Sequence, residues 1–261
     1  MQISNFNLNK AVALLAAMMF GGFAVAAPGD TGDRSKKSAD QIVWETRVGS
    51  RAIKNPAFAY VRDNPDLPRV LLIGDSISIG YTPVVRKELD GKANVHRIPM
   101  NGGDTSRGIE KLDEWLGSKR WDVIHFNWGL HDLKYMKDGH LDMSGSQVAS
   151  TEQYGRNLEL LVKRLKATGA RLIWASTTPV PKGSKGRVKG DEKKYNAVAA
   201  GIMKKNDIPI DDLYGYMIDK VGIYQNPANV HYNKAGYEYL GKKVAADIMR
   251  ELTRATADNA K

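Results

Sequence analysis

The chain has 261 residues, 42% of them hydrophobic, and a formal net charge of +10. This length is enough for one globular domain of ordinary size, whose core needs no disulfide or metal to hold it together. Because the chain has no cysteine, disulfides, thiolate metal sites and cysteine nucleophiles are excluded. The positive charge favours an acidic partner but does not bear on the fold.

The first segment has the pattern of an export signal. Lys10 precedes an apolar run over residues 11–26, which ends in Ala24-Val25-Ala26. A positive flank, a short apolar core and a small-x-small site are typical of a signal peptide, so residues 1–26 are predicted to be one, with cleavage after Ala26. The run is short for a membrane span, which disfavours the alternative of an uncleaved anchor. We therefore expect a secreted or periplasmic protein with no stable membrane anchor.

Residues 27–68 are predicted to form an N-terminal extension. The part up to Asp40 is polar and is expected to be loosely attached. The remainder carries Trp44, Phe58 and Tyr60, which indicates an ordered strap over the domain that follows.

From residue 69 onward, short apolar runs alternate with amphipathic stretches. The runs predict buried strands at residues 69–73, 94–99, 121–128, 171–177 and 208–213. The stretches predict helices near residues 81–90, 106–117, 151–168, 191–206 and 233–253. This alternation implies one α/β domain over residues 69–261, a three-layer α/β/α sandwich of flavodoxin-like type with a five-stranded, mainly parallel sheet. Such sheets place their sites at the carboxyl ends of the strands.

The turn after the first predicted strand contains Gly74-Asp75-Ser76. A serine in such a turn, at the start of a helix, exposes its hydroxyl, and the free N–H groups of the helix stabilise an anion nearby. Alone, the serine is explained equally well as a helix cap. The turn lacks the Gly-x-Ser-x-Gly pattern of the α/β-hydrolases, which argues against that fold.

Two further strand ends carry similar turns. The second strand is followed by Gly103-Asp104-Thr105-Ser106, in which glycine lets backbone N–H groups face an oxyanion or a phosphate. The third ends in the segment 127–132, which contains Asn127, Gly129, His131 and Asp132. Each turn alone has a plain structural interpretation, but polar, glycine-bearing turns at three neighbouring strand ends favour a site.

His231 precedes the last predicted helix. A histidine there can reach the end of the first strand and take a proton from a serine, although a lone histidine is more often structural.

Together these four blocks resemble the SGNH (GDSL-type) hydrolase family of serine esterases. The resemblance runs in the right order along residues 69–250. It implies that Ser76 is the nucleophile, that His231 is its base, and that the N–H of Gly103 belongs to the oxyanion hole. Asp75 and Asp132 are expected to organise the turns rather than to carry protons.

Two positions depart from the family pattern. His131 stands where the family has an asparagine that donates to the oxyanion; a neutral imidazole N–H can donate in the same sense, as can Asn127. Ala228 stands where the family has the aspartate that orients the histidine. Asn229, or a backbone carbonyl, is the substitute to consider, but neither supplies a negative charge to the imidazolium.

The substrate implied by the resemblance is a small-molecule or polysaccharide ester, most often an acetyl ester on a carbohydrate, cleaved without a cofactor or metal. Aromatic side chains for a sugar platform are available at positions that are also typical of a core, namely Trp128, Tyr135, Trp174 and Tyr195. The loop 181–190 carries four cations and is expected to overhang the site. These cations either attract an acidic glycan or simply keep the loop soluble.

Alternative functions remain open at this point. The missing aspartate is compatible with a catalytically weakened or inactive carbohydrate-binding protein on the same fold, and a lipase or thioesterase differs only in its acyl pocket. No nucleic-acid motif accompanies the basic residues. His125 and His131 lack metal-ligand spacing. The sequence does not indicate an oligomeric state.

Overall fold

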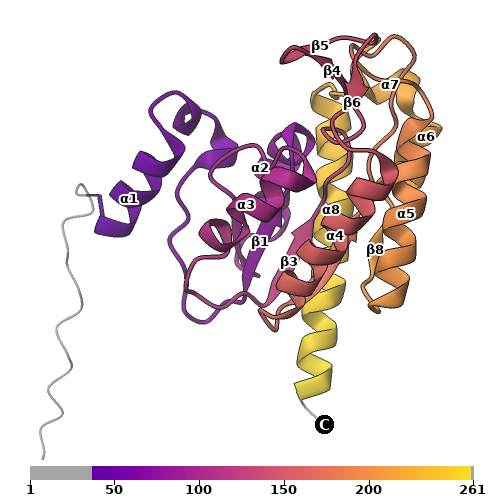
Figure 1. Cartoon of the computed structure of the whole chain (residues 1–261). Helices are drawn as coiled ribbons and strands as arrows, with labels where there is room; N and C mark the ends of the chain where they lie inside the picture. The colour runs from indigo at the N-terminus through magenta and orange to yellow at the C-terminus, as the bar shows by residue number, and fades with distance from the viewer. Residues whose placement is uncertain (1–36, 260–261) are drawn as a thin grey trace, which may run out of the picture. The chain divides into compact units, whose positions relative to one another are not determined.

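A computed structural model describes residues 37–259 of the chain (Figure 1). The predicted signal peptide over residues 1–26, with its cleavage site after Ala26, lies outside the described residues. Within residues 37–259, no helix is both long enough and apolar enough to cross a bilayer.

The centre of the structure is a parallel five-stranded sheet, as predicted. Its strands lie in the order β2 (Asn94–Arg97), β1 (Arg69–Ile73), β3 (Val123–Phe126), β7 (Arg171–Ala175) and β8 (Ile210–Asp211). Every residue of β3, and all but the first residue of β1 and of β7, is buried. These strands are near-continuous apolar runs because helices cover both faces of the sheet.

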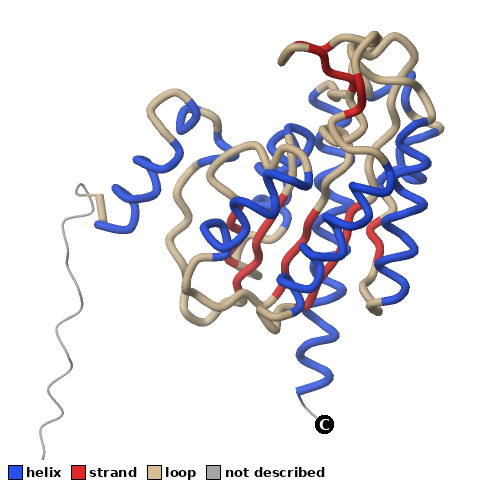
Figure 2. Tube along the Cα trace, viewed as in Figure 1, coloured by secondary structure: helices blue, strands red, loops and turns tan. Residues whose placement is uncertain are grey.

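Two groups of helices enclose the sheet, which Figure 2 shows as red strands between blue helices. One group consists of α2 (Ser76–Glu88) and α8 (Lys234–Asn259), which pack against each other. The other is a row in which α4 (Thr151–Lys166) contacts both α3 (Thr105–Leu116) and α5 (Asp191–Lys205). Figure 1 shows α4 in front of the sheet and α8 behind it. The predicted three-layer sandwich is confirmed.

Several short elements were not predicted. A small antiparallel sheet follows β3, with the strand order β5-β4-β6. Its strands are β4 (Tyr135–Lys137), β5 (His140–Leu141) and β6 (Ser146–Gln147). Two short helices, α6 (Leu213–Ile218) and α7 (Val221–Tyr224), lie between β8 and α8. Each has only two to six residues, too few to display a hydrophobic period.

The ordered strap predicted after residue 40 is helical. It contains α1 (Ala39–Val48) and the 3₁₀ turns η1 (Ala52–Lys54) and η2 (Pro56–Phe58). The indole N–H of Trp44 donates to the carbonyl of Phe58 at 2.7 Å. Val48 and Phe58 are buried in a small separate core against which Ile79 of α2 packs. This part of the N-terminal extension is therefore anchored to the first helix of the sandwich.

The contact between α2 and α8 is close because glycines allow it. A Cβ built on Gly80 of α2 would lie 2.0 Å from the ring of Tyr237 on α8. A Cβ on Gly241 of α8 would lie 2.5 Å from Val84. Since α2 begins at Ser76 and α8 follows the loop that holds His231, this contact sets the distance between the two side chains.

We expect Gly80→Ala to destabilise the protein, because the added methyl group collides with the ring of Tyr237. Overpacking of this kind lowers the free energy of unfolding by about 1–3 kcal/mol. Gly201→Ala, in α5, is the matched control, since its Cβ position meets nothing within 4 Å apart from the adjacent backbone of its own helix; it should raise stability by up to about 1 kcal/mol. Urea denaturation measures both, and an unchanged midpoint for Gly80→Ala would contradict the close packing.

Candidate active site

Ser76 is the first residue of α2, directly after the turn that ends β1. The carboxylate of Asp75 caps this helix by accepting the N–H of Ile77 at 2.9 Å. A residue in the first turn of a helix has no intrahelical partner for its N–H. The N–H of Ser76 therefore remains available beside its own hydroxyl.

The structure brings Ser76 and His231 together, although they are 155 positions apart. Their Oγ and Nε2 atoms are 2.8 Å apart. A backbone hydrogen bond holds the loop that carries His231: the N–H of Asn226 donates to the carbonyl of His231 at 2.9 Å. This loop leads directly into α8.

Asn229 orients the imidazole of His231. Its Oδ1 lies 2.7 Å from Nδ1 of the ring and also accepts the backbone N–H of His231 at 3.0 Å. Because the backbone N–H of His231 can only donate, the side-chain atom of Asn229 that it meets is the amide oxygen and not the amide nitrogen. An oxygen there requires the ring proton to lie on Nδ1. Nε2 then keeps its lone pair and accepts the hydroxyl proton of Ser76.

Ala228 takes no part in this arrangement. It has a left-handed backbone with φ of 51°, and its methyl group faces Gly183, whose Cβ position lies 3.2 Å away. Of the two positions considered from the sequence for orienting the histidine, only Asn229 makes a hydrogen bond to it.

His131 lines the same cleft as Ser76. Burial lowers the pKa of His131 below its ordinary value, which favours the neutral ring. Its Nδ1 lies 3.4 Å from Nζ of Lys134. Because an ammonium group can only donate, Nδ1 is the acceptor and the ring proton lies on Nε2. His131 can thus offer one N–H to an oxyanion.

The two other predicted oxyanion donors are engaged elsewhere. The N–H of Gly103, which has φ of 65°, donates to Oδ1 of Asn101 at 2.9 Å. The side chain of Asn127 donates to the carbonyl of Ala175 at 2.7 Å and does not line the cleft. The hypothesis that Asn127 reaches the oxyanion therefore disagrees with the geometry. Asn101, whose role the sequence did not reveal, does line the cleft.

Asp132 joins two of the strand-end turns. Its Oδ1 accepts both the N–H of Thr105 at 2.9 Å and the hydroxyl of the same residue. Burial raises the pKa of Asp132 to about 7. Asp132 and Asp75 thus both accept hydrogen bonds that hold turns in place.

The cleft around Ser76 and His231 has a volume of about 540 Å³. Its walls come from the strand-end turns, the small sheet β4–β6, the loop 181–190 and the loop before α8. Of the four cations in the loop that was expected to overhang the site, Lys185 and Arg187 line the cleft, whereas Lys182 and Lys189 do not. The side chains that the sequence did not assign to the cleft are Asn101, Leu130, Lys134, Met136, His140, Leu141 and Val230.

Of the two interpretations of the four aromatic residues, core rather than sugar platform holds for three of them. Trp128, Trp174 and Tyr195 are at most 1% exposed and belong to the core. Tyr135 in β4 is half-buried, but it does not line the cleft. The first two indoles follow or lie within central strands, where helices cover both faces.

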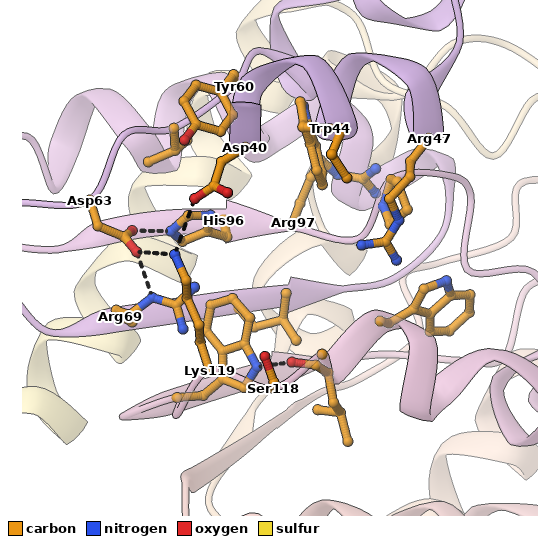
Figure 3. Close-up of a pocket in the computed structure, with 18 of the residues that line it drawn as sticks. Asp40, Trp44, Arg47, Tyr60, Asp63, Arg69, His96, Arg97, Ser118 and Lys119 are labelled. Carbon is orange, nitrogen blue, oxygen red and sulfur yellow. Dashed lines mark hydrogen bonds and ion pairs between the residues drawn. The ribbon is translucent and has the colours of Figure 1, made fainter. Parts of the chain in front are cut away.

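A second hollow, of about 450 Å³, lies at the edge of the sheet between α1, β2 and the end of α3 (Figure 3). Some of its charged groups are paired, whereas Arg62 and Arg97 line it without an ion pair to any residue in the range 37–259. Asp63 pairs with Arg69, His96 and Lys119, and Lys119 also reaches Asp40. The Ser76–His231 pair lies in the other cleft. Among residues 37–259, no group of three His, Asp or Glu residues is arranged to hold a metal ion.

The fold and the serine–histidine pair define a three-layer α/β/α hydrolase. The family model described as the GDSL-like Lipase/Acylhydrolase family matches residues 72–239, and the chain belongs to this family. Hydrolysis of esters is thus the general chemistry of the chain.

Solved structures share the fold at low sequence identity. The lipase/acylhydrolase from Enterococcus faecalis has a TM-score of 0.59 at 20% identity, with 69% of this chain and 95% of that chain covered. An acetyl xylan esterase has a TM-score of 0.58 at 15% identity, with 69% and 99% covered. An acetylxylan esterase from Geobacillus stearothermophilus has a TM-score of 0.57 at 16% identity, with 70% and 93% covered. No curated protein matches the chain.

The raised pKa of Asp132 predicts a pH-dependent stability. Between about pH 4 and pH 7 the folded state holds a proton on this carboxyl that the unfolded state has lost, so its contribution to stability falls as pH rises. Asp132→Asn keeps an oxygen acceptor for Thr105 and cannot ionise. Relative to wild type, the variant should therefore gain stability from pH 4 to pH 7. Denaturation at both pH values measures this, and a constant difference would contradict it.

Proposed function

We propose that the protein is an exported serine esterase, secreted or periplasmic, that removes acetyl groups from carbohydrates. The observation that carries this proposal is the hydrogen bond between Ser76 and His231, with Asn229 fixing the tautomer. Similarity in fold to acetylxylan esterases favours acetyl esters. The export pattern of the first 26 residues favours a substrate outside the cell.

The reaction proceeds in two steps. His231 takes the proton of Ser76 on Nε2 while Oγ attacks the ester carbonyl carbon. The imidazolium then returns this proton to the departing sugar oxygen, which leaves an acetyl group on Ser76. A water molecule gives its proton to His231 and attacks the acetyl carbon. Acetate departs, and the proton returns to Ser76.

The oxyanion receives N–H groups from Ser76 and from Nε2 of His131. Such donors are worth about 2.7–4 kcal/mol each in the barrier when they are preorganised. Asn101 is a candidate third donor. Its Oδ1 is engaged by Gly103, while its amide nitrogen makes no hydrogen bond within residues 37–259. If Asn101 turns away on substrate binding, Gly103 takes over the same task.

Asn229 performs one of the two tasks of the family's aspartate, which are to orient the ring and to stabilise the imidazolium. Its amide oxygen fixes the tautomer and the direction of the ring, but it carries no charge to stabilise the imidazolium. The inactive carbohydrate-binding protein therefore remains the second candidate, favoured by Ala228. The intact hydrogen bond between nucleophile and base favours the enzyme.

Covalent labelling tests the proposed function. A fluorophosphonate should label the protein stoichiometrically at Ser76, and the protein should release acetate from 4-nitrophenyl acetate and from acetylated oligosaccharides. Ser76→Ala should abolish the labelling and lower kcat on the order of 10³-fold or more. Ser78→Ala, which changes a buried serine two residues away, is the matched control and should retain labelling. Folded protein that neither reacts nor hydrolyses any ester would leave the binding protein as the function.

Substitution of Asn229 tests its role separately. Asn229→Ala removes the acceptor of the ring N–H and should lower kcat/KM roughly tenfold, the rate equivalent of one hydrogen bond. Asn229→Asp keeps the acceptor and adds the missing charge, so it should equal or exceed wild type. Steady-state hydrolysis of 4-nitrophenyl acetate measures both. An alanine variant with wild-type kinetics would show that the ring is held by other contacts.

A further inference from the structure

Three cationic side chains line the cleft beside Ser76. Lys134 follows β3, and Lys185 and Arg187 belong to the loop 181–190. Asp75 is the only carboxylate among the cleft-lining residues, and it is 3% exposed with one oxygen committed to the cap of α2. The wall of the cleft is therefore strongly positive.

No carboxylate within residues 37–259 forms an ion pair with any of these three cations. Carboxylates act on them from a greater distance, because the charge of Asp104 acts on Lys134 and that of Asp75 acts on Arg187. Burial and the nearby charge of Arg187 both lower the pKa of Lys134. Clustered like charges in a half-buried cleft repel one another, and an anion in the cleft removes this cost.

The guanidinium of Arg187 is already fixed in position. Its Nε donates to the carbonyl of Leu130 at 2.9 Å and its Nη1 to that of Lys185 at 3.3 Å. Its Nη2 has no partner within the described part of the chain. A guanidinium held along one edge presents its remaining N–H groups in a set direction, which suits a carboxylate.

The four cations of this loop are divided between two hollows. Lys185 and Arg187 line the cleft beside Ser76, whereas Lys182 and Lys189 line a different hollow that also contains Lys193 and Glu192. Solubility alone requires cations on the exposed surface; it does not require Lys185 and Arg187 to face the nucleophile. Their position therefore favours recognition of an acidic ligand over a general solubilising role.

We propose that the substrate is an ester of an acidic carbohydrate, whose carboxylate lies beside the scissile acetyl group and binds Lys134, Lys185 and Arg187. This inference rests on the proposed function and names the substrate class of the same cleft.

Matched substrates test the inference. O-acetylated oligogalacturonate and its carboxyl-methylated form differ only in the charge of the sugar. We expect kcat/KM for acetate release to be at least about tenfold higher for the anionic form. This ratio should fall as sodium chloride rises from about 0.1 M to about 1 M, because the screening length drops from about 10 Å to about 3 Å.

Replacing single lysines of the loop by glutamate tests which of them cause the preference for the anionic oligosaccharide. Lys185→Glu should lower the anionic-to-neutral ratio about fivefold or more. Lys189→Glu makes the same change of charge in the same loop but faces away from the cleft, and it should leave the ratio unchanged. Equal loss in both variants would indicate a long-range field rather than a binding site and would overturn the inference.

The possible outcomes separate this inference from the proposed function. Ser76-dependent acetate release at equal rates from both oligosaccharides would refute the acidic substrate and leave the esterase intact. Preference for 4-nitrophenyl hemisuccinate over 4-nitrophenyl acetate, without preference for the anionic sugar, would place the recognised charge on the acyl group and also overturn the inference. Absence of hydrolysis from every ester would refute the proposed function itself.

Discussion

The hydrogen bond between Ser76 and His231 is the contact on which the site depends. Its two partners are far apart in the chain and meet because α2 and α8 pack closely through Gly80 and Gly241. The packing of the helices thus holds Oγ of Ser76 and Nε2 of His231 at a distance of 2.8 Å. Catalysis requires such precision, since a displacement of about 1 Å costs on the order of 10²-fold in rate.

Two uncharged groups orient the base and donate to the oxyanion. Asn229 supplies direction without charge, and His131, with its proton on Nε2, replaces an amide donor with an imidazole. A neutral orienting group stabilises the imidazolium less than a carboxylate does. The positive wall formed by Lys134, Lys185 and Arg187 sets a requirement on the substrate, because a ligand that brings its own negative charge relieves the repulsion among these groups.

The alternation of apolar runs was sufficient to predict the five strands, the three layers and the edge at which the polar turns meet. The apolar pattern alone indicated a helix near residues 81–90, whereas the turn motif pointed to a helix beginning at Ser76, where the cap by Asp75 starts it. The orientation of Asn127 was not predictable, since it depends on the carbonyl of Ala175 in another strand. The burial of Trp174 agrees with its place in the predicted strand 171–177 rather than with a sugar platform. The hairpin of β4 and β5 has a signal in the sequence that was missed, since its turn is Asp138-Gly139 with both residues at positive φ.

The proton position on His231 is the most direct test of the account, because every step of the mechanism starts from it. Nitrogen-15 NMR of protein labelled at its five histidines, assigned with a His231→Gln variant, distinguishes a protonated from a bare ring nitrogen. We predict that, in the neutral ring, Nδ1 carries the proton and Nε2 is bare and hydrogen-bonded to Ser76. A proton on Nε2 in the resting protein would contradict the account, since that nitrogen could not then accept the proton of the nucleophile.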